Sequence, residues 1–332
     1  MKLRLADMFA GIGGTRLGFD RAFGDSVETV YVCELDPYAR KTYFANFDIG
    51  LTVVDSDITK VDEKVVPKFD ICLACFPCQA FSIAGKCEGL KDNYKGASRG
   101  ILFLDLIRIC ERIKPKVIFC ENVKGLIIHD KHRTLKVIVD AFQSIGYKVN
   151  WKMLNSKDYG LAQKRDRLYI VCFREDIDST GFEYPAPREE KTTISEIMED
   201  APIPAKYYLS KEYWSWCRRH RERHEAKGNG FGYIIRDIKG IAGTLVSGGM
   251  GRERNLIIDN RPHERSAKTN EDDVRKMTPR ECARLQGFPD SYKLPVADTH
   301  LYKQLGNAVS VNVVEDIAVE IKKVLSREDE GE

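Results

Sequence analysis

The sequence contains no apolar run long enough to cross a membrane, for which about 20 mostly apolar residues are needed. It also lacks a leader-like start, because the segment Met1 to Phe9 alternates and carries Arg4 and Asp7, as a strand does. The ten cysteines do not follow the framework pattern of small secreted proteins. We therefore expect a soluble, cytoplasmic protein with reduced thiols and no membrane partner.

Overall charge is small, at +3 over 332 residues, a length that favours two domains. The charge is unevenly placed, since residues 211–265 hold 12 basic side chains against 7 acidic ones. Aromatic residues are interleaved with these charges: Tyr213, Trp214, Trp216, Phe231 and Tyr233. This composition indicates a surface that faces a polyanion. A solvated basic helix around Arg218–Arg223 explains the charge equally well.

The first strand, glycine turn and helix lack the dinucleotide fingerprint G-x-G-x-x-G. Gly11, Gly13 and Gly14 follow the strand instead as G-x-G-G. A second strand, Val27 to Cys33, ends in Glu34, where an acidic side chain can accept hydrogen bonds from ribose hydroxyls. The pattern predicts a doubly wound α/β sheet that binds an adenosine-containing cofactor without a diphosphate.

Two further predicted strands end in acidic residues. Asp57 stands beyond the strand Leu51–Val54, where it could accept a hydrogen bond from an adenine amino group or make an Asx-turn. Glu121 follows the buried strand Lys116–Cys120. A partly desolvated glutamate has a raised pKa and can act as an acid near neutral pH. The alternative is a glutamate that caps the following segment.

Cys78 follows the buried strand Phe69–Ala74, at the sheet edge where α/β proteins place their chemistry. Pro77 stiffens the backbone before it. The polar segment after Ser82, up to Gly100, is long enough to be a lid. A cysteine in this position is a candidate nucleophile.

Three other interpretations of the cysteines are open. Cys72, Cys75 and Cys78 form C-x-x-C-x-x-C, which could hold zinc or an iron–sulfur cluster, although the next cysteine is Cys87 and a strand would turn Cys72 into the core. A redox pair is a second interpretation, although no obvious redox helix follows. Buried cysteines that act as small apolar residues are the third.

Arg165 and Arg167 lie around the start of a strand that runs to Phe173. We expect them to face opposite ways, one into the pocket and one toward a phosphate or an acidic neighbour.

The alternation of strands and helices stops near Glu189, after which glycine-rich stretches at 228–232 and 248–251 indicate loops. Regular structure returns at Thr278. This residue is followed by Pro279 at the first helical position and Glu281 at the third, a pattern that predicts a capping box.

Six stretches occur in a characteristic order: Asp7–Phe19, Phe76–Gln79, Glu121–Val123, Gln163–Arg167, Arg280–Pro289 and Gln304–Val309. Together they resemble the motifs of the DNA (cytosine-5)-methyltransferases of bacterial restriction–modification systems. The resemblance implies a Rossmann-like, S-adenosylmethionine-dependent methyltransferase sheet with a second, smaller target-recognition domain. It assigns residues 1–189, completed by 303–332, to the catalytic domain, 190–276 to the recognition domain and 277–302 to a hinge.

The resemblance also implies roles for individual residues. Cys78 would attack C6 of a flipped cytosine, Glu121 would protonate ring N3, and Arg167 would hold O2 and the Glu121 carboxyl. Arg165 would support the active site or contact the DNA backbone. The cofactor would be held by Phe9, Ala10, Gly11, Gly13, Gly14, Glu34, Leu35, Asp57, Ile58, Pro77, Leu102, Asn307 and Val309. DNA would be contacted by Gln79, Ser82, Asn229, Thr244, Leu245 and Gly249.

Two other functions compete with methylation of double-stranded DNA. One is methylation of cytosine in transfer RNA by a similar fold, and the other is a catalytically inactive regulator that binds DNA. The stretches 228–232 and 244–251 resemble two base-reading loops and favour DNA, but the sequence does not indicate which site they read. We expect no metal, a monomer, and at most a cognate restriction endonuclease in the same system without a stable complex.

Overall fold

The computed structural model describes residues 2–77, 102–200, 202–248, 253–261 and 266–329. The chain forms two compact units. The first unit contains Met1–Leu154, Asp166–Ala186 and Val313–Glu332, and the second contains Asn155–Arg165 and Pro187–Asn312. The functional domain boundaries proposed from the sequence stay a prediction. No helix within the described ranges is long and apolar enough to span a bilayer.

The first unit is built on a seven-stranded sheet with the order β3-β2-β1-β4-β5-β7-β6. The pairs β1–β2, β2–β3, β1–β4 and β4–β5 are parallel, and β5–β7 is antiparallel. The chain order reverses beside β1, which is where a doubly wound sheet opens a crevice for a ligand. The predicted α/β class is confirmed. The strands are β1 (Leu3–Met8), β2 (Val27–Cys33), β3 (Val53–Asp55), β4 (Ile71–Ala74), β5 (Val117–Val123), β6 (Tyr147–Asn155) and β7 (Asp166–Arg174).

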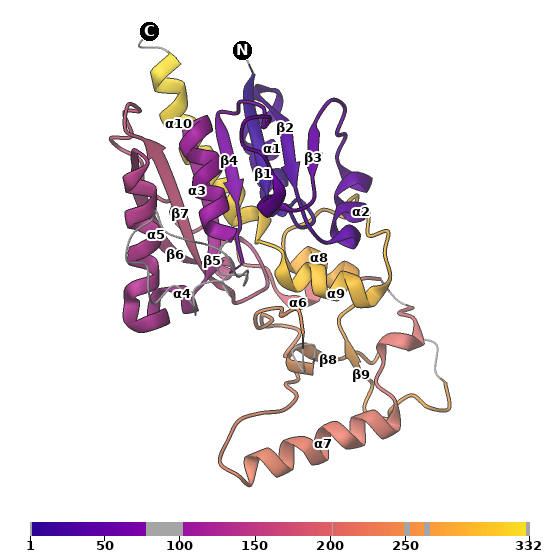
Figure 1. Ribbon diagram of the computed structural model, residues 1–332. Helices are drawn as coiled ribbons and strands as arrows, with labels where there is room; N and C mark the ends of the chain where they lie inside the picture. The colour runs from indigo at the N-terminus through magenta and orange to yellow at the C-terminus, as the bar shows by residue number, and fades with distance from the viewer. Residues whose placement is uncertain (1, 78–101, 201, 249–252, 262–265, 330–332) are drawn as a thin grey trace. The chain divides into compact units, whose positions relative to one another are not determined.

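Helices cover both faces of this sheet (Figure 1). On one face, Phe103 of α3 packs against Phe142 of α5, with ring centroids 5.4 Å apart, over the alternate buried residues of the strands. On the other face, Phe19 of α1 meets Phe119 of β5 at 5.3 Å. The helices of this unit are α1 (Gly14–Phe23), α2 (Pro37–Asn46), α3 (Leu102–Ile113), α4 (Gly125–Ile128), α5 (Arg133–Ser144) and α10 (Val311–Asp329).

Several element boundaries differ from the sequence prediction, and two of the differences concern predicted strand-end residues. The third strand begins at Val53 rather than Leu51, because Leu51 is fully exposed in a turn that the Thr52 amide closes by donating to the Ile49 carbonyl at 2.6 Å. Glu121 lies within β5 rather than beyond its end. Its position near the carboxyl end of the strand still places it at the edge where chemistry is expected.

The second unit has little regular structure. A small apolar core on one side of α7 contains Leu209, Trp214, Cys217, Leu256 and Val274. The two short strands pair antiparallel. The elements are α6 (Ile194–Ile197), α7 (Lys211–Glu225), β8 (Leu256–Ile258), β9 (Val274–Lys276), α8 (Pro279–Leu285) and α9 (Asp298–Asn307).

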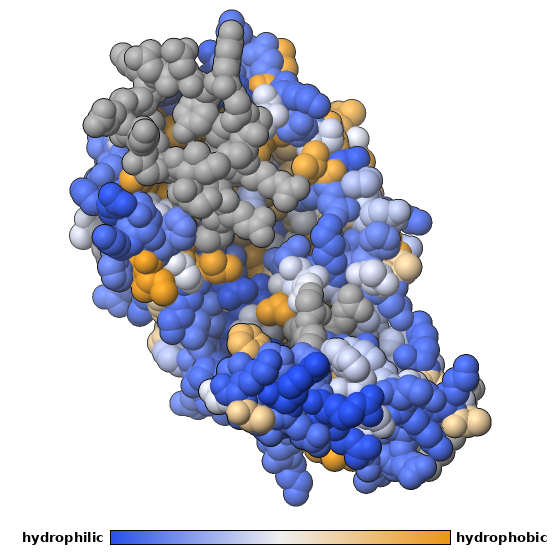
Figure 2. Space-filling view, turned by 60° about the horizontal axis from the view of Figure 1, so that its bottom comes forward, coloured by the Kyte–Doolittle hydropathy of each residue, from blue (hydrophilic) through white to orange (hydrophobic). Residues whose placement is uncertain are grey.

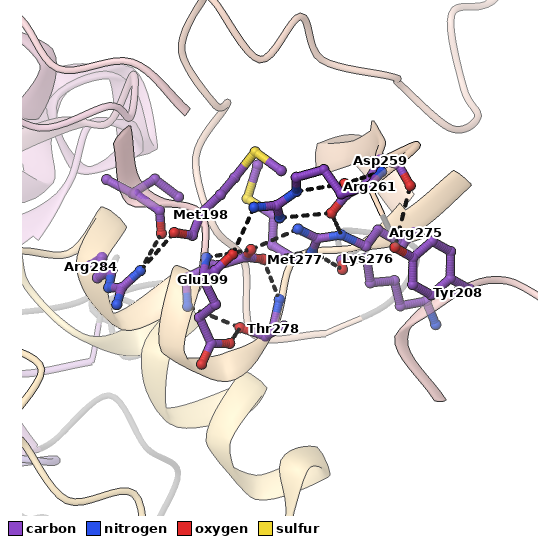
Figure 3. Close-up of polar contacts among 12 residues, drawn as sticks. Met198, Glu199, Tyr208, Asp259, Arg261, Arg275, Lys276, Met277, Thr278 and Arg284 are labelled. Atoms are coloured by element: carbon purple, nitrogen blue, oxygen red, sulfur yellow. Dashed lines mark hydrogen bonds and ion pairs between the residues drawn. The ribbon is translucent and has the colours of Figure 1, made fainter. Parts of the chain in front are cut away.

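A buried ionic network supplements this small core (Figure 3). The Arg275 side chain is fully buried, and its Nε donates to Asp259 Oδ2 at 2.7 Å. Its two Nη atoms donate to the two carboxylate oxygens of Glu281, each at 2.7 Å. Burial alone would raise the pKa of Asp259, but the hydrogen bonds from Arg261 and Arg275 lower it to about 2. The Asp259 carboxylate therefore stays charged at neutral pH.

Glu281 is also part of the capping box at the start of α8, as the sequence predicts. Thr278 is the N-cap and its hydroxyl accepts from the Glu281 amide at 3.1 Å, while the Thr278 amide donates to Glu281 Oε2 at 2.8 Å. Pro279 occupies the first helical turn. One carboxylate thus completes a capping box and neutralises the buried Arg275.

Candidate functional site

The turn after β4 carries the predicted nucleophile motif. The Phe76 side chain is buried and stacks near Phe103 of α3, with centroids 5.1 Å apart. Asn122 of β5 donates from Nδ2 to the Phe76 carbonyl at 3.0 Å, which ties this turn to the neighbouring strand. The sequence did not assign Asn122 a role, although its place beside Glu121 could have suggested one. Pro77 is the last described residue here, and Cys78, Gln79, Ser82 and the predicted lid lie outside the described ranges.

The two described cysteines of the C-x-x-C-x-x-C pattern have separate surroundings. Cys72 is buried in β4, with its Sγ 3.8 Å from that of Cys110, as expected for a strand residue turned into the core. Cys75 Sγ lies 3.4 Å from Thr15 Oγ1. Burial first, and the nearby Glu121 carboxylate second, raise the pKa of Cys75, so its thiol stays protonated at neutral pH. Cys75 is therefore not suited to nucleophilic attack.

Glu121 and Arg167 form an ion pair in the first unit. Arg167 Nε lies 3.0 Å from Glu121 Oε1, and the two side chains are 12% and 9% exposed. The antiparallel register of β5 and β7 brings them together, because Val123 is opposite Arg167 and Glu121 is opposite Tyr169. Asn122 lies between Glu121 and Val123 in β5, and its side chain donates to the Phe76 carbonyl in the turn after β4. An acid and a cation thus stand near the end of β5, the strand whose Asn122 holds the Phe76 carbonyl.

Arg165 belongs to the second unit and has different partners. Its Nη1 donates to the Leu245 carbonyl at 3.0 Å, and its Nη2 donates to the carbonyls of Gly306 and Ala308 at 3.2 and 2.8 Å. Strand alternation does not separate Arg165 from Arg167, because residues two apart on a strand share a face. They differ because Arg165 lies before β7 begins, at Asp166. Arg165 is bonded to main-chain carbonyls and positions backbone.

The expected cofactor turn has the backbone that a close approach requires. Gly11 and Gly13 have φ of 56° and 81°, and Phe9 has φ of 57°, all in the left-handed region. A Cβ on Gly13 would lie 2.3 Å from Phe47 Cε2, whereas a Cβ on Gly11 would meet no atom within 4 Å. Gly13 is thus required by packing, and Gly11 leaves open space beside the turn. Ala10 and Gly14 are buried in the same turn.

Glu34 is oriented by the backbone around it. Its Oε2 accepts from the Gly11 amide at 2.8 Å and its Oε1 from the Asp36 amide at 2.7 Å. A carboxylate has about four acceptor positions, so these two bonds leave capacity for the two hydroxyls of a ribose. Leu35 next to it is 67% exposed. This arrangement fits an adenosine group.

The Asp57 side chain makes an Asx-turn, one of the two roles considered for it in the sequence analysis. Its side chain caps the short helix η2 (Ile58–Lys60), accepting from the Thr59 amide at 3.2 Å and the Thr59 hydroxyl at 2.7 Å. Those hydrogen bonds lower the pKa of Asp57, with smaller contributions from Lys60. Ile58 is buried and Leu102 is half-buried. The remaining expected cofactor residues, Asn307 and Val309, belong to the second unit.

A buried carboxylate that sequence analysis did not single out lies under the cofactor turn. Asp7 in β1 is 1% exposed, and its Oδ2 has no hydrogen-bond partner within the described residues. Burial raises the pKa of Asp7 to about 7, while Arg16 and Tyr43 act in the opposite direction. Asp7 therefore titrates near physiological pH.

The expected DNA-contacting residues that the structure describes lie in the second unit. Asn229 Oδ1 is 2.7 Å from His224 Nδ1. Thr244 donates to the Lys164 carbonyl at 2.8 Å, and the Leu245 amide donates to Gln163 Oε1 at 2.8 Å. The arginine motif therefore fixes the predicted loop that begins at Thr244. Gly249 lies outside the described ranges.

The sheet order, the glycine turn and the strand-end acid define a Rossmann-like methyltransferase fold. Solved structures confirm this fold. A methyltransferase described as Dnmt2 from S. pombe is 17% identical with a TM-score of 0.72, covering 99% of this chain and 100% of that one. A putative DNA modification methyltransferase encoded within a prophage of E. coli is 20% identical with a TM-score of 0.70, covering 98% and 100%.

The family model described as C-5 cytosine-specific DNA methylase matches residues 3–323. Type II methyltransferase M.HpaII of Haemophilus parainfluenzae is 46% identical, covering 98% of this chain and 90% of the relative. M.NlaX of Neisseria lactamica is 41% identical, covering 97% of each chain, and M.HhaI of Haemophilus parahaemolyticus is 38% identical, covering 98% and 95%. The chain belongs to the C-5 cytosine-specific DNA methylase family, and the predicted enzyme class is confirmed.

Proposed function

We propose that this enzyme transfers a methyl group from S-adenosylmethionine to C5 of a cytosine that is flipped out of a specific double-stranded DNA sequence, through a covalent Cys78 adduct. The observation that carries the proposal is the Glu121–Arg167 pair, with Nε and Oε1 3.0 Å apart, beside the turn that leads to Cys78. Family membership supplies the reaction class.

The chemistry explains why these residue types are required. Attack of the Cys78 thiolate on C6 forms an S–C6 bond and moves electron density toward C5 and N3. Donation of a proton to N3 by Glu121 relieves the developing negative charge, and Arg167 orients that carboxyl. Loss of the C5 proton after methyl transfer then breaks the S–C6 bond and releases Cys78. The cytosine must leave the stack because C6 is inaccessible inside a duplex.

The residues present fit the cofactor. Glu34 would receive the ribose hydroxyls, and the open side of Gly11 would admit the methionine portion near the start of α1. When bound, S-adenosylmethionine supplies an electrophilic methyl group. Phe9, Gly13 and Asp57 would shape the remaining wall, and Leu35, Ile58, Pro77, Leu102, Asn307 and Val309 stay predicted contacts.

The test uses a duplex in which 5-fluorocytosine replaces the target base, so that the C5 substituent cannot leave as a proton. The target site is first mapped by bisulfite sequencing of plasmid DNA from an expressing host. The wild-type protein with S-adenosylmethionine should form an adduct that resists denaturation, and Cys78→Ala should form none. Methyl transfer to transfer RNA in preference to duplex DNA, or an adduct that persists in Cys78→Ala, would overturn the proposal.

A further inference from the structure

The segment from Glu34 to Asp36 joins β2 to α2 and carries the carboxylate that is expected to receive the ribose. Two consecutive carbonyls of this segment accept hydrogen bonds from one nitrogen. Arg40 Nη1 donates to the Glu34 carbonyl at 2.7 Å and to the Leu35 carbonyl at 2.9 Å. This nitrogen carries two N–H groups, so it can make both bonds at once. Arg40 therefore holds two neighbouring peptide groups in a fixed orientation.

Arg40 reaches the segment because of its place in α2. Asp36 is the N-cap of this helix, and its side chain accepts from the Tyr38 amide at 2.9 Å and the Ala39 amide at 3.3 Å. The Arg40 amide donates to the Asp36 carbonyl at 3.0 Å, so Arg40 lies one turn after the cap. Long side chains on a helix point back toward its N-terminus, which directs this guanidinium at the residues before the cap.

The Glu34 side chain is fixed by the same segment. Its Oε1 accepts from the Asp36 amide at 2.7 Å, and its Oε2 accepts from the Gly11 amide at 2.8 Å. A rotation of the peptide groups between Glu34 and Asp36 would move the amide that fixes Oε1. The direction of the carboxylate therefore depends on the backbone that Arg40 holds.

Burial of apolar side chains contributes little to the order of this segment. Leu35 is 67% exposed and Tyr38 is 46% exposed. Figure 2 shows small hydrophobic groups among hydrophilic residues at the upper right of the molecule, the side on which α2 lies in Figure 1. A segment with few buried apolar contacts opens easily unless its hydrogen bonds hold it. The two bonds from Arg40 are thus important for its conformation.

The charge of Arg40 acts on Glu34 as well. Burial raises the pKa of Glu34, whereas the hydrogen bonds from the Asp36 and Gly11 amides and the positive charge of Arg40 lower it. The negative charge of Asp36 acts in the same direction as burial. An ionised carboxylate accepts at both oxygens, as two ribose hydroxyls require. Arg40 therefore favours the form of Glu34 that can bind a ribose.

We propose that Arg40 is a positioning residue that aims Glu34 at the ribose hydroxyls of the cofactor. The preference for a ribose over a 2′-deoxyribose then depends on a side chain whose Nη1 donors go to the backbone. The proposal rests on the cofactor that the function proposed above requires, and it adds a residue that sets how well the sugar is recognised.

The experiment measures two affinities of the full-length protein by calorimetry, without DNA. The ligands are S-adenosylhomocysteine, which is the methyl donor without its methyl group, and its 2′-deoxy analogue. The wild-type protein should bind the analogue about 10- to 100-fold more weakly, because a hydrogen bond to a charged acceptor is lost. Arg40→Met should bind S-adenosylhomocysteine about 10-fold more weakly and prefer it over the analogue by less than about threefold.

A second substitution separates positioning from a general loss of structure. In a Glu34→Gln background, Arg40→Met should leave the preference for the ribose unchanged, because the carboxylate that Arg40 aims is absent. Arg174→Met is the matched control. Arg174 Nη1 also donates to a backbone carbonyl, that of Lys114 at 2.6 Å, but it lies at the end of β7 beside the start of β5, away from the carboxyl end of β2. This control should keep the wild-type preference.

Thermal unfolding of each variant identifies any that fail to fold. Arg40→Gln, which also removes the charge and keeps a good helix former, then carries the test. A ribose preference in the Arg40 variants as large as that of the wild type, whatever their overall affinity, overturns the proposal. Equal binding of the two ligands by the wild-type protein overturns it too. A wild-type protein that binds neither ligand instead overturns the proposed function.

Discussion

Two buried pairings of arginine with carboxylate, one in each unit, are built differently. In the second unit, Arg275 uses all three side-chain nitrogens on Asp259 and Glu281, at distances of 2.7 Å. In the first unit, Arg167 meets Glu121 through Nε at 3.0 Å, near the end of a strand and partly exposed. The difference separates two uses of the same chemistry. Three charged hydrogen bonds from one buried arginine join parts of a fold, whereas we expect the pair at the strand end to hold an acid where a substrate can reach it.

Removal of the acid should have the largest effect. Glu121→Gln keeps the shape of the side chain but cannot donate a proton to ring N3, so the rate of methyl transfer should fall by about 10²- to 10⁴-fold. Single-turnover transfer to the mapped duplex measures this rate, and thermal unfolding in parallel reports on the fold. A rate within tenfold of wild type would show that Glu121 does not supply the proton.

Disruption of the structural network should instead affect stability. Arg275→Met leaves the buried Glu281 without its cation and Asp259 with Arg261 alone, and should lower the free energy of unfolding by about 3–5 kcal/mol. Denaturant titration measures the change. The control is Lys206→Met, which breaks a pair in the same unit whose side chains are 60% and 35% exposed, and it should cost at most about 1 kcal/mol. Equal effects of the two substitutions would remove the distinction drawn above.

Asp7 is a further buried carboxylate, and its Oδ2 accepts no hydrogen bond within the described residues. Its pKa is raised from 3.8 to about 7 in the folded protein, so between these pH values the folded state binds a proton that the unfolded state has lost. Its contribution to stability is therefore present below pH 4 and is lost as pH rises through about 7, at about 1.4 kcal/mol for each unit of pKa change. Denaturant titration from pH 5 to 8 should show wild type losing stability relative to Asp7→Asn. A constant difference would contradict the raised pKa.

The capping box should give the smallest effect. Thr278→Ala removes the hydroxyl that accepts from the Glu281 amide and should cost about 1 kcal/mol of unfolding free energy. Thr278→Ser keeps the hydroxyl and should remain close to wild type. The comparison shows how much of the role of Glu281 lies in the helix start and how much in the pair with Arg275. A loss as large as that of Arg275→Met would mean that the two roles cannot be separated.

Features with local causes were predicted well from the sequence. The capping box at Thr278 depends on residues three positions apart or fewer, and it is present. The α/β class followed from buried strands, glycine turns and helical patterns in order. The motif set identified the family because each motif has a short, specific composition.

Features that depend on distant chain segments were not predictable in the same way. Arg165 is held by carbonyls 80 to 143 positions away, and no local pattern indicates such partners. The register of β5 and β7, which joins Glu121 to Arg167, is likewise set by the whole sheet. The proton affinity of Asp7 depends on how completely the surrounding layers exclude water. Cys78 lies outside the described residues, and its role stays a prediction.

The Arg165 guanidinium has a consequence for how the affinities for DNA and for the cofactor depend on each other. It joins the Leu245 carbonyl, in a loop expected to read DNA, to the carbonyls of Gly306 and Ala308, which flank a residue expected to hold the cofactor. If DNA binding displaces one end of this clamp, we expect the other end to move with it. If bound DNA changes the affinity for the cofactor by some factor, the cofactor must change the affinity for DNA by the same factor. A substitution at Arg165 would then change both affinities.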